Sequence, residues 1–207
     1  MSVAPFPSVS KRVFDVAAAL TGLVLLAPLF VVVAVWIRLD SPGPVFFRQE
    51  RVGRGGKPFR IHKFRTMRVG AEAAGPALTV GADPRITRAG AFLRRTKIDE
   101  LPQLLDVLRG DMSVVGPRPE VARYVAAYPP ALREKVLSVR PGITDPASLQ
   151  FRDESTLLAR AADPEREYRE VVLPAKLRLA ADYVDTASLG GDLRLIAATL
   201  RALWSRP

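Results

Sequence analysis

Two adjacent carboxylates at positions 99 and 100 are the residues best suited to chemistry. Asp99 and Glu100 follow a basic stretch and open a segment that is predicted to be helical. One carboxylate can attack phosphorus as a nucleophile, while its neighbour binds a metal ion or transfers a proton. The alternative is structural, because acidic residues are common in the first turn of a helix and Asp99 could cap it. Both interpretations stay open on these residues alone.

Three cations could serve the same chemistry. Arg118 lies between Pro117 and Pro119, which restrict the backbone and leave the guanidinium to bind phosphate oxygens in pairs. Lys63 and Arg65 end a predicted strand and could act in the same way, although each could equally be a surface cation. Together with the carboxylates they predict phosphoryl transfer, in which cations and a divalent metal offset the charge of a nucleotide pyrophosphate.

The composition narrows the classes of partner and chemistry. The chain has 207 residues, enough for one domain and an appendage, and a formal net charge of +10. That charge predicts an anionic partner: nucleic acid, anionic lipid or a phosphorylated substrate. The absence of cysteine excludes thiol catalysis, and a single histidine, His62, argues against a serine-type triad or a multi-histidine metal site. With 7% aromatic residues, the stacking surface of a nucleic-acid binder is sparse.

The segment from Val13 to Ile37 is predicted to enter a membrane. It is apolar apart from Asp15 and Thr21, and its length matches the hydrocarbon thickness of a bilayer. Basic residues on both sides favour keeping both ends in the cytoplasm. Pro28, near the middle, predicts a kink and hence a re-entrant helix. A kinked spanning helix and a buried core helix are the alternatives.

Downstream, the sequence predicts a β-hairpin and then an amphipathic helix. Residues 45–50 and 58–63 have strand-like patterns and are joined by a glycine-rich turn. Residues 96–110 open with acids and a proline, carry a leucine stripe and end at glycine, which predicts one helix. The hairpin is densely basic, and we expect it to contact anionic lipid headgroups, with a merely solvated basic face as the alternative.

Proline and glycine residues mark most of the predicted turns and helix boundaries in the rest of the chain. Residues 113–120 are predicted to form a rigid loop, and Pro141-Gly142 predicts a type II turn within residues 140–144. The remaining predictions are a loop or short helix at 71–81, a charged helix from Asp163-Pro164 to about residue 173, a helix over 175–185, and a last helix that begins at Asp192, after Gly190-Gly191.

Seven features of the chain, in this order, resemble the bacterial sugar transferase family of monotopic polyprenyl-phosphate phosphoglycosyl transferases. The resemblance covers nearly the whole chain. It is carried by Lys11-Arg-Val-Phe-Asp15, Pro28, the segment 41–53 (SPGPVFFRQERVG), Lys63-Phe-Arg-Thr-Met67, Lys97-Ile-Asp-Glu-Leu-Pro-Gln103, the segment 110–119 (GDMSVVGPRP) and Arg140-Pro-Gly-Ile-Thr144.

The resemblance implies a role for each of these motifs. Asp99 would be the nucleophile that forms a covalent phosphosugar intermediate, Glu100 its partner in the dyad, and Mg²⁺, held by these two carboxylates, the required ion. Lys63, Arg118 and Asp192 match other polar positions of the family's active site. The implied reaction moves a sugar-1-phosphate from a UDP-sugar to polyprenyl (undecaprenyl) phosphate and releases UMP, as the first membrane step in building a surface glycan.

The expected fold class is α+β and mainly helical. We expect a re-entrant membrane helix in residues 1–40, and a catalytic domain in residues 41–207 with a short β-hairpin and amphipathic interfacial helices. The resemblance implies membrane lipids as partners, no nucleic acid, room for a homodimer, and a location on the cytoplasmic face of the bacterial inner membrane. One segment, Asp145 to Glu154, departs from the glycine-tryptophan sequence that follows Arg140–Thr144 in many relatives.

Two other functions are compatible with parts of the sequence. A membrane-tethered basic domain that binds anionic lipid or nucleic acid would explain the charge and the apolar segment, but it gives Asp99 and Glu100 no task. An ordinary glycosyltransferase would move the sugar without its phosphate and would release UDP rather than UMP.

Overall fold

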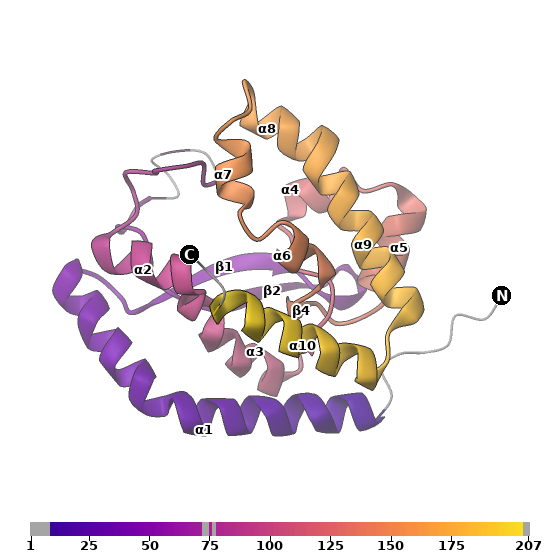
Figure 1. The fold of residues 1–207 in the computed structure, drawn as a ribbon, viewed down its shortest axis with the longest axis horizontal. Coiled ribbons are helices and arrows are strands. Elements are labelled where there is room, and N and C mark those ends of the chain that lie inside the picture. The colour runs from indigo at the N-terminus through magenta and orange to yellow at the C-terminus, as the bar shows by residue number, and fades with distance from the viewer. Residues whose placement is uncertain (1–8, 72–74, 76–77, 205–207) are drawn as a thin grey trace.

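A long N-terminal helix runs along one side of the protein, and the other elements pack above it (Figure 1). The computed structural model describes residues 9–71, 75 and 78–204. In this part the chain is mainly helical, as predicted, and it contains two small sheets, of which only the hairpin was predicted. The elements in chain order are α1 (Val9–Asp40), β1 (Phe46–Val52), η1 (Arg54–Gly56), β2 (Pro58–Phe64), α2 (Arg88–Thr96), η2 (Ile98–Gln103), α3 (Leu104–Arg109), β3 (Ser113–Val115), α4 (Ala122–Val125), α5 (Pro130–Leu137), β4 (Gly142–Thr144), α6 (Pro146–Gln150), α7 (Glu154–Leu158), α8 (Pro164–Glu167), η3 (Tyr168–Val172), α9 (Leu173–Thr186) and α10 (Leu189–Trp204).

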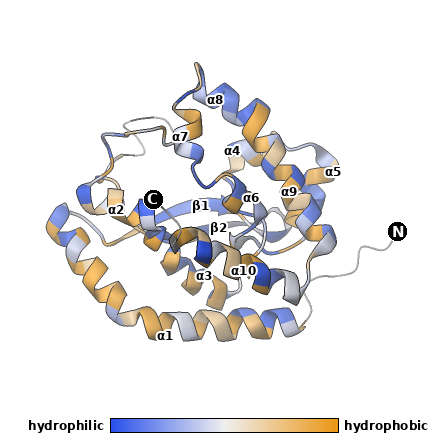
Figure 2. Ribbon diagram, in the orientation of Figure 1, coloured by the Kyte–Doolittle hydropathy of each residue, from blue (hydrophilic) through white to orange (hydrophobic). Residues whose placement is uncertain are grey.

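Helix α1 leaves most of its apolar surface uncovered (Figure 2). It has 32 residues, and only 11% of its most apolar stretch is buried against the rest of the protein. The core helix of a soluble domain would be mostly buried, so this exposure disfavours that alternative. By length and composition α1 could cross or anchor to a membrane. Its exposed large apolar residues are Val9, Val13, Leu20, Val24, Leu25, Val31, Val32, Val35, Trp36 and Leu39.

Helix α1 is bent rather than straight (Figure 1). Pro28 lies inside it and has no N–H with which to bond the carbonyl of Val24, one turn earlier. A proline in a helix interior is a common cause of such a bend. The bend and the position of Pro28 agree with the predicted kink.

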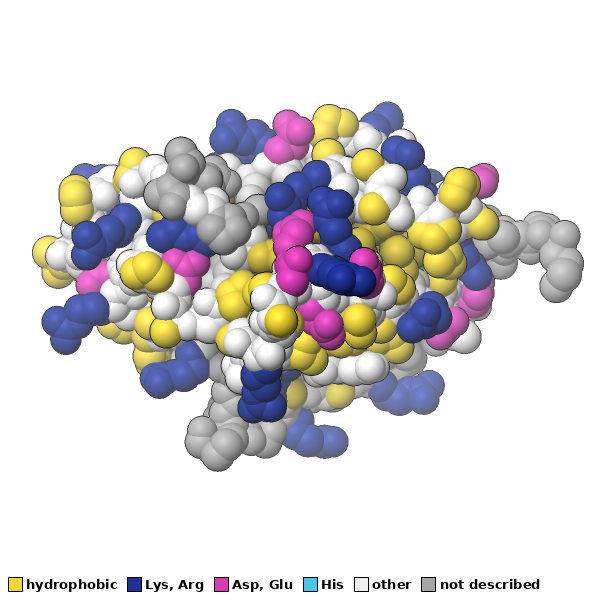
Figure 3. Space-filling model, turned by 90° about the horizontal axis from the view of Figure 1, so that it is seen from above, with side chains coloured by type: hydrophobic (Ala, Val, Ile, Leu, Met, Phe, Trp, Pro, Cys, Tyr) yellow, Lys and Arg dark blue, Asp and Glu magenta, His cyan; other side chains and the backbone are white. Residues whose placement is uncertain are grey.

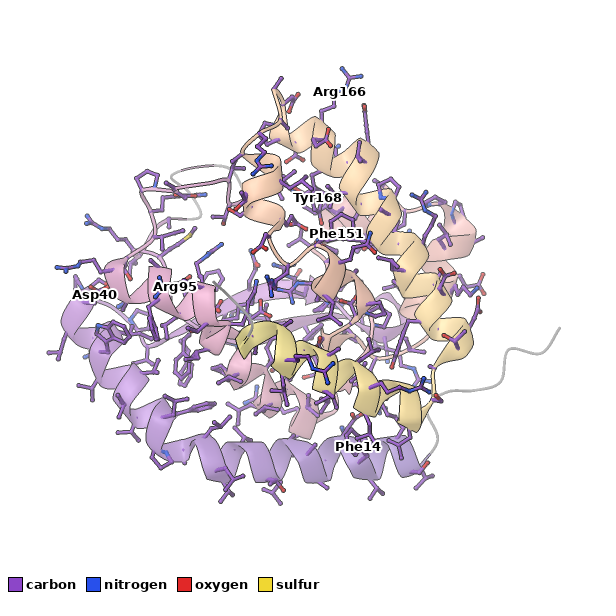
Figure 4. All side chains as sticks on the ribbon, viewed as in Figure 1. Phe14, Asp40, Arg95, Phe151, Arg166 and Tyr168 are labelled. Carbon is purple, nitrogen blue, oxygen red and sulfur yellow. The ribbon has the colours of Figure 1, made fainter. Side chains whose placement is uncertain are left out.

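One narrow face of α1 packs against the rest of the chain. Near its start, Lys11, Asp15 and Ala19 are buried at intervals of four residues. Further along, a cluster of Val33, Ile37, Phe64 and Leu93 joins α1 to β2 and α2. At its end, a carboxylate oxygen of Asp40 accepts a hydrogen bond from the backbone N–H of Ala89 in α2 at 3.0 Å (Figure 4). The division into an anchor and a catalytic domain at residue 40 stays a prediction.

The predicted hairpin is confirmed. Strand β1 begins one residue later and ends two residues later than predicted, and β2 ends one residue later. Strands β1 and β2 pair antiparallel, with Phe47 opposite Lys63. The turn between them contains Gly55 and Gly56 at φ values of 67° and 77°, which glycine adopts without steric cost. The hairpin therefore delivers Lys63 at the end of β2, close to η2.

The single helix predicted over residues 96–110 is wrong in its first half. Helix α2 ends where Lys97 adopts a left-handed conformation, with φ of 59°. Residues 98–103 then form the 3₁₀-helix η2, which contains Pro102, a residue without an N–H for the helical ladder. The α-helix begins only at Leu104. It ends as predicted at Gly110, which has φ of 91°.

The type II turn predicted within residues 140–144 is also wrong. Gly142 is not at positive φ, and it begins β4, which pairs in parallel with β3. The same pairing shows that the predicted loop 113–120 opens with a short strand. A Cβ on Gly142 would lie 2.1 Å from the backbone nitrogen of Gly116. Glycine is therefore required here by the close approach of two backbones, which local sequence does not reveal.

The C-terminal helices follow the predicted pattern with one shift. Asp163 caps α8, and the chain continues through the π-helical turn η3 into α9, as expected around Pro174. Helix α10 begins at Leu189, so the predicted interruption at Gly190-Gly191 and start at Asp192 are wrong. The side chain of Ser188 accepts a hydrogen bond from the N–H of Gly191 at 3.2 Å, which supports the earlier start. In the stretch 71–81, residues 72–74, 76 and 77 lie outside the described residues, and the others form turns, bends or irregular backbone.

The face opposite the long straight part of α1 carries many charged side chains, with apolar side chains among them (Figure 3). Seen from above, it shows Lys and Arg side chains beside Asp and Glu (Figure 3). Its ion pairs include Arg166 with Glu170 at 2.9 Å and Arg169 with Glu165 at 2.9 Å. Arg166 points outward from this face, whereas Tyr168 and Phe151 point into the protein (Figure 4). A charged face on one side and apolar α1 on the other suit a protein that lies between water and a membrane.

Candidate active site

Glu100 is held by two cations from different parts of the chain. Its Oε1 lies 2.8 Å from Nζ of Lys63, at the end of β2. Its Oε2 accepts a hydrogen bond from Nη1 of Arg118 at 3.0 Å, and Nη2 of Arg118 donates to Oε1. This two-point contact uses the geometric match of guanidinium and carboxylate. The structure thus brings together three of the residues that the sequence predicted to share a site.

The charges of this cluster stabilise one another. Burial opposes the ionisation of Glu100, but the charges of Arg118 and Lys63 outweigh it and hold the pKa of Glu100 well below its usual value. The charge of Glu100 in turn raises the pKa of Arg118. Burial lowers the pKa of Lys63, and Glu100 opposes that change. Glu100 is therefore a carboxylate, and it aligns two cations at one edge of the site.

Asp99 differs from its neighbour because one of its oxygens has no partner. Only 7% of Asp99 is exposed, and within the described structure its buried Oδ1 makes no hydrogen bond. The 3₁₀-helix that contains it has no side-chain cap, and the N-cap residue is Lys97. The capping interpretation of Asp99 therefore has no supporting contact. An unpartnered buried oxygen costs stability, which makes Asp99 a candidate for function.

Burial and the adjacent Glu100 raise the pKa of Asp99 to about 6. The positive charges of Lys63, Arg94 and Lys97 act in the opposite direction. Asp99 is thus half ionised near pH 6 and mainly a carboxylate at neutral pH, and it lies among cations that would also attract phosphate. A reactive carboxylate and neighbouring phosphate-binding groups are the parts that phosphoryl transfer requires.

Comparison with known proteins shows which family this chain belongs to. The model of the bacterial sugar transferase family matches residues 6–206. The chain belongs to this family. A Caulobacter vibrioides relative, named UDP-glucose:undecaprenyl-phosphate glucose-1-phosphate transferase, is 41% identical over 207 residues, covering 96% of this chain and 73% of the relative.

Two further relatives of this bacterial sugar transferase are similar at the same level. A Bacillus subtilis protein, named putative undecaprenyl-phosphate N-acetylgalactosaminyl 1-phosphate transferase, is 49% identical over 134 residues, covering 65% of this chain and 70% of that protein. The exopolysaccharide production protein PSS of Rhizobium leguminosarum is 41% identical over 203 residues, covering 93% of this chain and 94% of the relative. The family resemblance inferred from the motifs is confirmed.

The carboxylates of the candidate site match the expected Mg²⁺ only in part. Within the described residues, no group of three or more His, Asp or Glu side chains could hold a metal ion on its own. Asp99 Oδ1 is free to act as a ligand, whereas both oxygens of Glu100 are engaged by cations. Mg²⁺ commonly takes one or two carboxylates and completes its shell with water and substrate phosphates. The residues fit such a site through Asp99, and a contribution from Glu100 would require a cation to move.

Two predicted substrate-binding residues, Arg65 and Asp192, make contacts within the protein. Arg65 is 5% exposed and donates to the carbonyl oxygens of Ser41 at 2.6 Å and Pro42 at 2.5 Å, just beyond α1. Asp192 is fully buried and accepts from Tyr183 Oη at 2.8 Å, and it lies 2.7 Å from Nζ of Lys11. Among the described contacts, neither makes a hydrogen bond or ion pair with Lys63, Glu100 or Arg118. Their substrate-binding role stays a prediction.

Two neighbours of Arg118 were not identified from the sequence. Arg51 donates from Nη1 to the carbonyl oxygen of Pro119 at 3.0 Å, and Asp145 accepts from the backbone N–H of Arg118 at 3.2 Å. A signal for Asp145 was present, because Asp145-Pro146 repeats the aspartate-proline start used to predict α8 at Asp163. The contact with Arg118 itself is non-local and has no local signal.

Proposed function

We propose that this bacterial sugar transferase moves a sugar-1-phosphate from a UDP-sugar to polyprenyl phosphate, giving polyprenyl-diphosphate-sugar and UMP. The observation that carries the proposal is the unpartnered, buried Oδ1 of Asp99 beside a Glu100 that aligns Lys63 and Arg118. The names of its relatives support the donor and acceptor classes. The product would be the first lipid-linked unit of a surface glycan, such as an exopolysaccharide.

In the first step, an oxygen of the Asp99 carboxylate attacks the phosphorus that carries the sugar. The bond from that phosphorus to the oxygen of the nucleoside phosphate breaks, and UMP leaves with the electron pair. The sugar-phosphate stays on Asp99 as a mixed anhydride. Lys63 and Arg118 offset the negative charge on the pyrophosphate while this exchange occurs.

In the second step, a phosphate oxygen of the lipid attacks the same phosphorus. The bond to Asp99 breaks, the carboxylate is restored, and the sugar is linked to the lipid through a diphosphate. Both leaving groups depart as anions, so neither step needs a proton donor. Mg²⁺, when bound by Asp99 and the phosphates, would further offset their charge.

The alternative reaction at this site is transfer of the sugar without its phosphate. Product analysis with a radiolabelled UDP-sugar and polyprenyl phosphate separates the candidates. UMP supports the proposal, UDP would indicate an ordinary glycosyltransferase, and neither product would indicate a membrane-bound domain without this activity.

We expect the rate to depend on the ionisation of Asp99. Because only its carboxylate form attacks phosphorus, kcat/KM for the UDP-sugar should fall about tenfold per pH unit below the pKa of about 6 and level off above pH 7. Initial rates from pH 5 to 8 would test this, with circular dichroism to confirm folding throughout. A profile that is flat below pH 6 would contradict the assignment of Asp99.

We further propose that α1 is re-entrant, with both of its ends on the cytoplasmic face of the bacterial inner membrane. Pro28 and the bend of α1 support this topology, as do the basic residues on both sides. Cysteines introduced at the exposed Val9 and, separately, at the exposed Ala127 should both be protected from an impermeant thiol reagent in intact spheroplasts. Labelling at position 9 alone would indicate a spanning helix. A homodimer stays a prediction, which the mass of the detergent-solubilised protein would test.

A further inference from the structure

Asp145 is a buried carboxylate that joins two segments of the chain. It is 1% exposed, at the end of β4 and the start of α6. Its Oδ1 accepts from the backbone N–H of Ser148 at 2.7 Å, which caps α6. Its Oδ2 accepts from the backbone N–H of Arg118 at 3.2 Å. The first contact is an ordinary helix cap, whereas the second reaches the loop that carries a candidate phosphate-binding residue.

The loop around Arg118 has few backbone N–H groups through which hydrogen bonds could hold it in place. Pro117 and Pro119 have none, so Arg118 supplies the one backbone donor of the three residues. Asp145 accepts that donor. The carbonyl oxygens on either side are also held, because Gly142 donates to Pro117 at 3.0 Å and Arg51 donates to Pro119 at 3.0 Å. The backbone around Arg118 is thus restrained from β4, from Asp145 directly after it, and from Arg51 in the hairpin.

We propose that Asp145 is a positioning residue for Arg118. By holding the backbone N–H of Arg118, it sets where the guanidinium leaves the loop, so that the guanidinium meets Glu100 and the pyrophosphate of the donor. The inference rests on the proposed role of Arg118 in binding that pyrophosphate. A capping role alone would account for the hydrogen bond that Oδ1 of Asp145 accepts from Ser148, but not for the one that Oδ2 accepts from Arg118.

The chain contains a matched control for the capping role. Asp163 also precedes a proline and begins a helix, and its Oδ1 accepts from the backbone N–H of Arg166 at 3.1 Å. It makes no described contact with the site. Serine at either position can still cap, because it offers one side-chain oxygen. It cannot occupy both the Ser148 and the Arg118 donors in the way the two oxygens of Asp145 do.

The test compares Asp145→Ser with Asp163→Ser in the full-length protein. Loss of the hydrogen bond to the backbone N–H of Arg118 should lower kcat/KM for the UDP-sugar about tenfold in Asp145→Ser. Asp163→Ser should keep the wild-type value. Thermal unfolding of both variants would show whether the proteins are folded, and Asp145→Asn, which keeps the size of the side chain, would replace Asp145→Ser if the latter did not fold.

A double-mutant cycle with Arg118→Ala separates positioning from a general structural effect. If Asp145 acts through Arg118, Asp145→Ser should cause little further loss in the Arg118→Ala background. A wild-type kcat/KM in Asp145→Ser, or an equal loss in both backgrounds, would overturn the inference. Turnover that survives Asp99→Asn would instead contradict the proposed function, so the two failures are distinguishable.

Discussion

Asp99→Asn is expected to lower turnover by roughly 10³-fold or more, because an amide has nearly the same shape as a carboxylate but is a far poorer nucleophile. Expression and membrane association should be unchanged. Steady-state release of UMP from a UDP-sugar, in the presence of polyprenyl phosphate, would measure the loss. Asp163→Asn is a suitable control, since Asp163 caps a distant helix.

The same substitution should not destabilise the protein. Asp99 is buried, its Oδ1 is unpartnered, and its pKa is raised to about 6 from an ordinary value of 3.8. A carboxyl group with a raised pKa costs stability as the pH rises through that range, here on the order of 3 kcal/mol at pH 7. Removing the charge should therefore leave the melting temperature equal or higher. A lower melting temperature would support the capping interpretation, and retained turnover would exclude Asp99 as the nucleophile.

Local patterns in the sequence predicted the elements that depend on neighbouring residues. The apolar run of α1, the glycine turn of the hairpin and the stop at Gly110 each follow from side-chain types within a few positions. The motifs also predicted that Lys63, Glu100 and Arg118 share a site, and the structure brings them into contact. Their roles in catalysis stay predictions.

Elements that depend on distant residues were missed or misplaced. The parallel pairing of β3 with β4 needs Gly142 to approach Gly116, and the sequence around either glycine suggests only a turn or a loop. The contacts of Asp192 with Lys11 and Tyr183 were also missed, since local spacing cannot identify them, and its assignment to substrate binding stays a prediction. The prediction of a single helix over residues 96–110 was wrong for a different reason. Its leucine stripe is genuine, but the left-handed Lys97 and Pro102 give its first half another backbone.

The enzyme is expected to release UMP before any lipid acceptor is present. A nucleophilic carboxylate divides the transfer into two displacements, so the first can proceed with the UDP-sugar alone. The amount should be about one UMP per active site, in a single burst, because the sugar-phosphate then occupies Asp99. Chelation of divalent metal should suppress the burst if Mg²⁺ offsets the charge of the phosphates. Direct attack by the lipid phosphate on the donor would give no such burst.

Rapid quench with a UDP-sugar labelled in the sugar-linked phosphate, without polyprenyl phosphate, tests the two-step mechanism most directly. The expected result is stoichiometric UMP together with a labelled protein adduct that maps to Asp99 and disappears when lipid phosphate is added. The absence of both UMP and adduct, in enzyme shown to be active with lipid, would contradict the covalent mechanism.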